Sequence, residues 1–198
     1  MKVFLSWSGA RSKGVADAFA LWLPQAIHAI EPWMSSDLDD GVPWSGYISS
    51  QLEATAVGII CLTADNYTSP RILFEAGALA KTNAHVGTFL LDPPDGAIAH
   101  PLRHFHHTLY EKDDLGRLLI TINGKVAAAG ERALTELMLN HSFEAWWPRL
   151  RQKLDSVPAA SVTLGDSESD PDAIAESNDA QLSKARETPY SGGSPLSF

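Results

Sequence analysis

The sequence contains a single cysteine, Cys61, among its 198 residues. One cysteine excludes a disulfide framework within the chain and favours a reducing compartment, and its place in an apolar run predicts a buried strand residue. Long hydrophobic runs are also absent, since no stretch approaches the roughly 18 apolar residues of a membrane span. The opening MKVFLSWSG is too short for a signal peptide and is typical of a strand that ends in a loop. We therefore expect a soluble, cytoplasmic protein with no membrane partner.

Basic side chains are scarce as well. The 15 lysines and arginines stand against 24 acidic residues, and the resulting net charge of −9 argues against direct nucleic-acid binding. Residues 156–198 carry seven acidic but only two basic side chains, and they show no hydrophobic periodicity. We expect this segment to be a disordered acidic, Ser-rich tail. Residues 1–155 are long enough to form one domain with its own core.

Several fingerprints of known chemistry are missing. The chain has no GxGxxG and no GxxxxGK[ST] motif, which excludes the common dinucleotide and P-loop signatures, and it has no GxSxG nucleophile elbow. His100, His104, His106 and His107 cluster without a cysteine or an HExxH partner, which indicates a solvated loop rather than a zinc site. We therefore expect neither a metal nor a resident cofactor.

Short apolar strands alternate with helices along residues 1–155. This alternation is typical of an α/β fold with a parallel sheet covered by helices on both faces. The predicted strands are residues 2–6, 32–34, 57–62, 86–91 and an edge strand within 104–110. The predicted helices are residues 13–30, 45–54, 70–80, 113–123 and 131–154.

The most informative stretch is SPRILFEAGALA, residues 69–80. Ser69 suits an N-cap and Pro70 suits the first helical position. Glu75 lies within the apolar pattern of this helix, where a carboxylate is costly if buried and without use if exposed. Two interpretations remain open: an ordinary first-turn glutamate favoured by the helix dipole, or a working carboxylate at the rim of a pocket.

Ligands of open parallel sheets bind beyond the carboxyl ends of the strands. Residues 6–11, 35–44, 63–69 and the start of the Glu75 helix should meet at that edge. Their aromatic faces, small polar groups, two arginines and one carboxylate suit a nucleotide. The candidate site residues are Ser6, Trp7, Ser8, Arg11, Ser36, Asp37, Trp44, Arg71 and Glu75.

Three segments, in this order, resemble Toll/interleukin-1 receptor (TIR) domains. VFLSWSGARSKGVADAF resembles the first conserved box, and SSDLDDGVPW resembles the long loop after the second strand. SPRILFEAGALAK is similar to the third-helix motif of bacterial TIR proteins, in which a glutamate is catalytic in the NAD-cleaving members. The resemblance covers about residues 1–155 and implies a flavodoxin-like fold with a parallel sheet of about five strands.

The same resemblance implies cleavage of the nicotinamide–ribose bond of NAD, with Glu75 as the catalytic carboxylate. Nicotinamide is a cationic leaving group that needs no general acid, and a carboxylate near the ribose stabilises an oxocarbenium-like transition state. Tryptophans would stack on the nicotinamide or adenine ring, and Arg11 would pair with the diphosphate. Family members often carry tryptophan four residues before the glutamate, where this chain has Arg71. The product therefore stays open among ADP-ribose, a cyclic isomer and a conjugate.

Bacterial proteins of this type commonly act in anti-phage defence, by depleting NAD or by making a nucleotide signal for a separate effector protein. Their sites are often completed by self-association, so we expect a homo-oligomer or filament through residues 35–44. Two alternatives remain: a non-catalytic TIR interaction module in which Glu75 is structural, and an enzyme similar to nucleoside 2-deoxyribosyltransferases.

Overall fold

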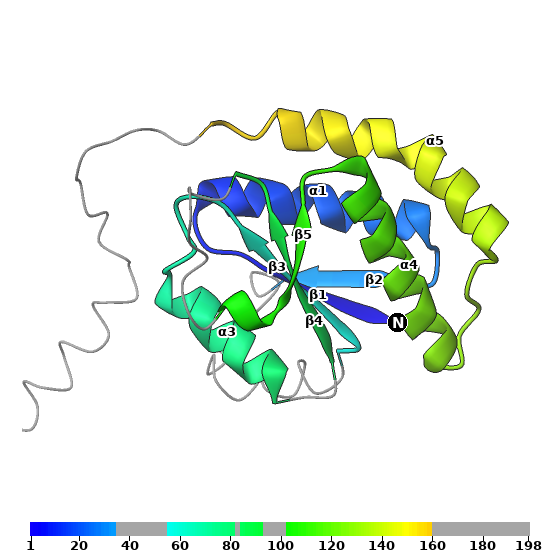
Figure 1. Cartoon of the computed structure of the whole chain (residues 1–198), viewed down its shortest axis with the longest axis horizontal. Helices are drawn as coiled ribbons and strands as arrows, with labels where there is room; N and C mark the ends of the chain where they lie inside the picture. Colours follow the sequence, from blue (N-terminus) through cyan, green and yellow to red (C-terminus); the bar gives the residue numbers. More distant parts are fainter. Residues whose placement is uncertain (35–54, 82–83, 93–101, 160–198) are drawn as a thin grey trace, which may run out of the picture. The chain divides into compact units, whose positions relative to one another are not determined.

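The computed structural model describes residues 1–34, 55–81, 84–92 and 102–159 (Figure 1). The described strands form one all-parallel sheet in the order β2-β1-β3-β4-β5, which is the flavodoxin-like order. The predicted fold class is therefore confirmed. The strands are β1 (Lys2–Ser6), β2 (Glu31–Met34), β3 (Val57–Leu62), β4 (His85–Leu90) and β5 (His106–Leu109).

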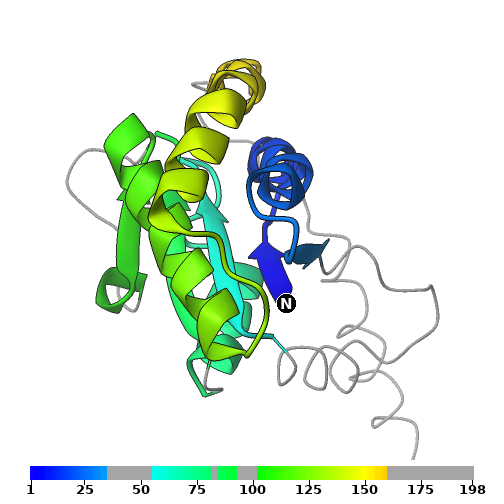
Figure 2. The ribbon, with the colours of Figure 1, turned by 90° about the vertical axis from the view of Figure 1, so that its right-hand side faces the viewer.

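Helices cover both faces of the sheet (Figures 1 and 2). One face packs against α1 and α4, on which α5 packs in turn, and the other face packs against α3. Successive strand residues point to opposite faces, so Leu5 joins the first core whereas Phe4 contacts the α3 residue Leu79. The helices are α1 (Ala10–Ala26), α3 (Pro70–Ala80), α4 (Lys112–Ala128) and α5 (Glu136–Asp155), with a short 3-10 turn η2 (Leu102–His104).

Aromatic side chains join the layers on the α1 face. The ring of Phe19 lies edge-on to Phe89, with 4.9 Å between centroids, and Trp22 meets Phe143 of α5 in the same geometry at 6.3 Å. Edge-to-face contacts of this kind add to the free energy gained from burial. Cys61 is fully buried in this core, as predicted, and burial raises the pKa of its thiol.

Several helix boundaries differ from the prediction: α1 ends at Ala26 rather than at residue 30, α4 extends to Ala128 rather than 123, and the first and last helices start elsewhere. The first helix starts at Ala10 rather than at residue 13, because Gly9 adopts φ of +84°, a conformation that suits glycine and turns the chain from β1 into the helix. Pro24 lies inside the last turn of α1 without ending it. The last helix starts at Glu136, where the Thr135 side chain caps it by accepting a hydrogen bond from the Met138 N–H at 3.3 Å.

The described fold continues past the predicted domain boundary at residue 155. Val157 packs against the core beside Gly14 of α1, and the carbonyl of Pro158 accepts a hydrogen bond from Arg11 Nε at 2.6 Å. Residues from 160 onward, which make up most of the predicted tail, lie outside the described residues. None of the helices in the described ranges has the length and apolar character to cross a bilayer.

These contacts predict different results for two truncations. Removing residues 160–198 should leave the melting temperature nearly unchanged, because the composition of this segment offers few apolar side chains to bury. Removing residues 156–198 should lower it by several degrees, because Val157 and the acceptor for Arg11 are then lost. Thermal unfolding followed by circular dichroism compares the two. Equal melting temperatures for both truncations would contradict a role for residues 156–159.

Two histidines, one on β4 and one on β5, should make the stability depend on pH. Burial lowers the pKa of His85, and the charges of Lys125 and His106 lower it further. Burial and His106 also lower the pKa of His107, whose Nδ1 lies 2.5 Å from Thr88 Oγ1. In the unfolded chain these imidazoles have a pKa of about 6.5. Below that pH the unfolded state binds more protons than the folded state, so stability falls as the pH drops.

We therefore expect the melting temperature to be lower at about pH 5.5 than at about pH 7.5. Replacing both His85 and His107 with glutamine should narrow this difference, whereas replacing the exposed His28 should leave it as in the wild type. Thermal scans of the three proteins at the two pH values provide the measurement. An unchanged difference in the double variant would show that other groups cause the acid sensitivity.

Candidate functional site

A buried hydrogen bond joins the end of β1 to α3. Alternation along β1 places Ser6 on the same face as Phe4, toward α3. Ser6 Oγ donates to Glu75 Oε2 at 2.6 Å, and both side chains are fully buried. Glu75 is the sixth residue of α3, so the interpretation as a first-turn glutamate is wrong. The expected place at a pocket rim is also corrected, because Glu75 is 0% exposed.

Arg71 contacts the other oxygen of the same carboxylate. Its Nε donates to Glu75 Oε1 at 3.2 Å, from one turn earlier on α3. The Arg71 side chain is 29% exposed, so it lies between the buried carboxylate and the surface. A buried carboxylate is tolerated when it is paired and hydrogen-bonded, and Glu75 meets both conditions.

Trp7 lies next to this pair. The Arg71 guanidinium carbon is 5.3 Å from the centroid of the Trp7 ring, and Lys13 Nζ is 5.7 Å from it. Cations within about 6 Å of an indole face are attracted by the electron-rich ring. The indole Nε1 of Trp7 is buried and finds no hydrogen-bond acceptor among the described residues. The structure therefore brings together four of the predicted site residues: Ser6, Trp7, Arg71 and Glu75.

Ser8 and Ser69 connect the loop after β1 to the start of α3. Ser69 occupies the predicted N-cap position, but its side chain makes no capping hydrogen bond. Its Oγ instead donates to Ser8 Oγ at 3.0 Å, and the Ser8 N–H donates to Ser12 Oγ at 2.9 Å. Ser8 thus holds the two segments that carry Trp7 and Arg71 beside each other.

Arg11 anchors the carboxyl edge of the sheet. Its Nη1 donates to Asp65 Oδ2 at 3.1 Å, its Nη2 pairs with Asp92, and its Nε donates to the carbonyl of Pro158. The side chain is 11% exposed. Contact with a diphosphate stays a prediction; three of the five guanidinium N–H donors already bind these acceptors.

The predicted site residues did not include Asp65, Asn66 or Asp92. Asn66 fixes the turn before α3, because its Oδ1 accepts from the Thr63 N–H at 2.9 Å and its Nδ2 donates to the Cys61 carbonyl at 3.0 Å. All three residues lie in the loops that follow strands β3 and β4. Their place at the carboxyl ends of two strands was the available signal.

The remaining predicted residues, Ser36, Asp37 and Trp44, lie outside the described residues. The same holds for the whole segment 35–44 and for the self-association predicted through it.

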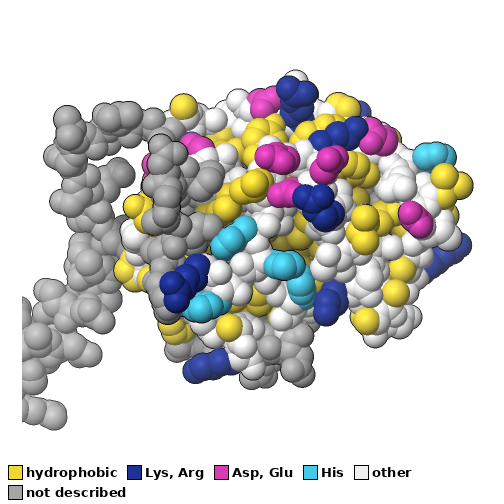
Figure 3. All heavy atoms as spheres, viewed as in Figure 1, with side chains coloured by type: hydrophobic (Ala, Val, Ile, Leu, Met, Phe, Trp, Pro, Cys, Tyr) yellow, Lys and Arg dark blue, Asp and Glu magenta, His cyan; other side chains and the backbone are white. Residues whose placement is uncertain are grey.

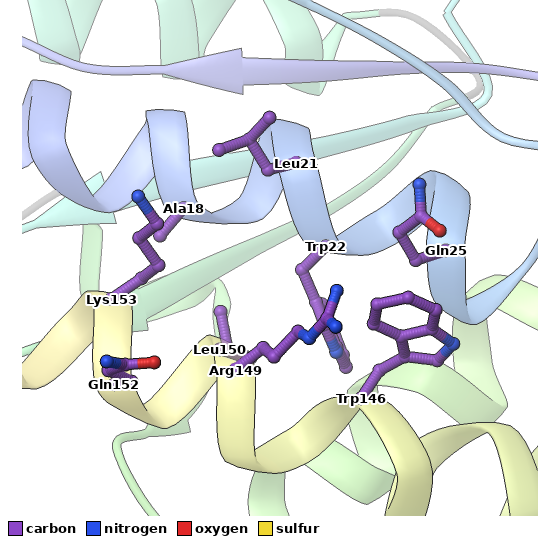
Figure 4. A pocket seen from close by; sticks show the side chains of 9 residues that line it. All are labelled: Ala18, Leu21, Trp22, Gln25, Trp146, Arg149, Leu150, Gln152 and Lys153. Carbon is purple, nitrogen blue, oxygen red and sulfur yellow. The ribbon is translucent and has the colours of Figure 1, made fainter.

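Two cavities lie elsewhere in the described fold. One, of about 400 Å³, is lined by residues of α1 and α5. Figure 4 shows Trp22 and Trp146 extending into this space from the two helices. The other, of about 360 Å³, lies between α4 and strands β4 and β5, on the side of the molecule where histidines gather in Figure 3. His85, His106 and His107 line it, but the described residues include no group of three or more His, Cys, Asp or Glu side chains arranged to hold a metal ion.

Comparison with protein-family models and with curated proteins gave no match for this chain. Two observations therefore bear on function: the geometry around Glu75 and the resemblance of the three segments.

Proposed function

We propose that this protein is a TIR-type enzyme that cleaves the nicotinamide–ribose bond of NAD, with Glu75 as the catalytic carboxylate. The observation that supports this most is the fully buried Glu75, hydrogen-bonded to Ser6 at 2.6 Å where β1 ends. Burying a carboxylate costs several kcal/mol of solvation, and an apolar side chain would pack this position at lower cost. The carboxyl ends of the strands are also where ligands bind in this class of fold.

The chemistry follows from the charge of the substrate. The bond between ribose C1′ and the nicotinamide nitrogen breaks, and its electron pair leaves with the ring, which becomes neutral nicotinamide. The ribose then carries positive charge, which the Glu75 carboxylate stabilises. Water attacks C1′ and loses a proton to give ADP-ribose; attack by an adenine nitrogen gives a cyclic product. In this proposal Ser6 holds one carboxylate oxygen in place and Trp7 provides a face for the nicotinamide ring.

The direct test is incubation of the purified full chain with NAD, followed by mass spectrometry. We expect free nicotinamide together with ADP-ribose, a cyclic isomer or a conjugate. A parallel incubation with purine and pyrimidine deoxynucleosides tests the transferase alternative. Intact NAD at every protein concentration would contradict the proposal.

One observation favours the alternative of a non-catalytic TIR interaction module. The resting carboxylate is fully buried and accepts hydrogen bonds on both oxygens, as a purely structural glutamate would. In that case the chain would leave NAD intact, and replacing Glu75 would change stability alone. We also propose a part in anti-phage defence, a separate effector protein for the product, and assembly through residues 35–44. These three proposals rest on the resemblance alone.

A further inference from the structure

The Arg71 guanidinium contacts two neighbouring groups, the Glu75 carboxylate and the Trp7 ring. Its Nε donates to Glu75 Oε1 at 3.2 Å, and its central carbon lies 5.3 Å from the Trp7 ring centroid. The group is planar, its positive charge is delocalised, and such groups stack readily on aromatic faces. It therefore combines an aromatic contact with a carboxylate contact at the end of β1.

We propose that Arg71 is an internal competitor of the substrate: in the resting protein its guanidinium holds the place of the nicotinamide–ribosyl cation, and NAD displaces it. This inference rests on the proposed function. The nicotinamide ring of NAD is also a planar, delocalised cation, so it would use the Trp7 face and the Glu75 carboxylate in the same way. A second planar cation placed beside Glu75 Oε1 would be repelled by the guanidinium that already pairs with this oxygen.

The positions of the partners show which of them can move. Ser6 belongs to a central strand and is fully buried, whereas Arg71 reaches Glu75 through a long, partly exposed side chain. Lys13, the other cation near Trp7, is already paired with Asp17 at 2.9 Å. Among the described residues, Arg71 is therefore the cation that contacts both the Trp7 ring and the Glu75 carboxylate.

A competitor of this kind has a defined kinetic effect. The apparent Kd for NAD equals the intrinsic Kd divided by the fraction of protein in which the guanidinium has left, so a small open fraction weakens binding. At saturating NAD the guanidinium is displaced in every complex, so kcat does not change. A purely structural Arg71 would instead support kcat or stability and would not weaken binding.

The test is Arg71→Gln, which keeps an amide donor for Glu75 Oε1 but removes the charge. We expect KM for NAD to fall by about tenfold or more while kcat stays within about twofold of the wild type. Arg71→Lys keeps the charge but loses the planar stack, so its KM should lie between the two. An unchanged or higher KM in both variants would overturn the inference, and if Arg71→Gln does not fold, the KM of Arg71→Lys decides alone.

A second measurement separates this inference from the proposed function. 1-Methylnicotinamide is a planar pyridinium cation without a ribose, and its binding is measured by calorimetry. It should bind Arg71→Gln about tenfold more tightly than the wild type, and Trp7→Ala in the same background should abolish the gain. Equal binding to both proteins would overturn the inference even if NAD is cleaved. Tighter binding to the variant, with NAD left intact by both proteins, would support the competitor role and refute the proposed reaction.

Discussion

Replacing Glu75 with glutamine should reduce NAD cleavage by about a hundredfold or more, which is the scale of one lost electrostatic stabiliser. The fold should stay intact. Glutamine has the shape of glutamate, and its amide oxygen can still accept the hydrogen bond from Ser6 Oγ. The negative charge that would stabilise the ribosyl cation is lost. The former partner Arg71 is partly exposed and can reach water, so we expect only a small change in stability.

Steady-state nicotinamide release and a thermal scan on the same preparation provide the measurement. Glu144→Gln is a matched control, since Glu144 forms an ion pair with Lys112 at 2.7 Å but is 60% exposed and belongs to α5. The control should retain wild-type turnover. A folded Glu75→Gln variant with near-wild-type turnover would remove Glu75 from the mechanism.

Replacing Gly58 with valine should destabilise the protein by about 1–3 kcal/mol, the usual cost of overpacking a core. A Cβ atom at Gly58 would lie 2.7 Å from Leu79 Cδ1 and 3.1 Å from its Cδ2. Leu79 is fully buried against Phe4, so its side chain has little room to move aside. The strain would therefore push α3 away from β3. Glu75 lies on the same face of α3 as Leu79, so its hydrogen bond with Ser6 would weaken.

A double-mutant cycle tests this cause. Leu79→Ala alone should cost about 2–5 kcal/mol, because it leaves a cavity. Combined with Gly58→Val it should cost less than the sum of the two, since the valine fills part of that cavity. Gly77→Ala on the same helix is the control: a Cβ there has no neighbour within 4 Å, and alanine favours a helix. Additive costs in urea unfolding would show that the close approach of α3 to Gly58 is not the cause.

The sequence by itself predicted the five strands, four of the helices and the parallel sheet; the predicted helix 45–54 lies outside the described residues. The run 57–62 is buried at every position, as its apolar composition predicted, and α3 begins at Pro70 immediately after Ser69. Alternating strands and helices also predicted the parallel sheet, and the structure confirms it. These features were predictable because periodicity, proline and capping residues act within about ten residues of the chain.

Only the tertiary structure decided which side chains meet. Ser6 and Glu75 are 69 residues apart, and their hydrogen bond depends on the strand order and on how closely α3 packs at Gly58. Arg11 pairs with carboxylates that follow two different strands rather than remaining free for a ligand. A sequence pattern predicts that a residue is buried or lies at a strand end. The partner of a buried polar group follows from strand register and helix packing, which join segments far apart along the chain.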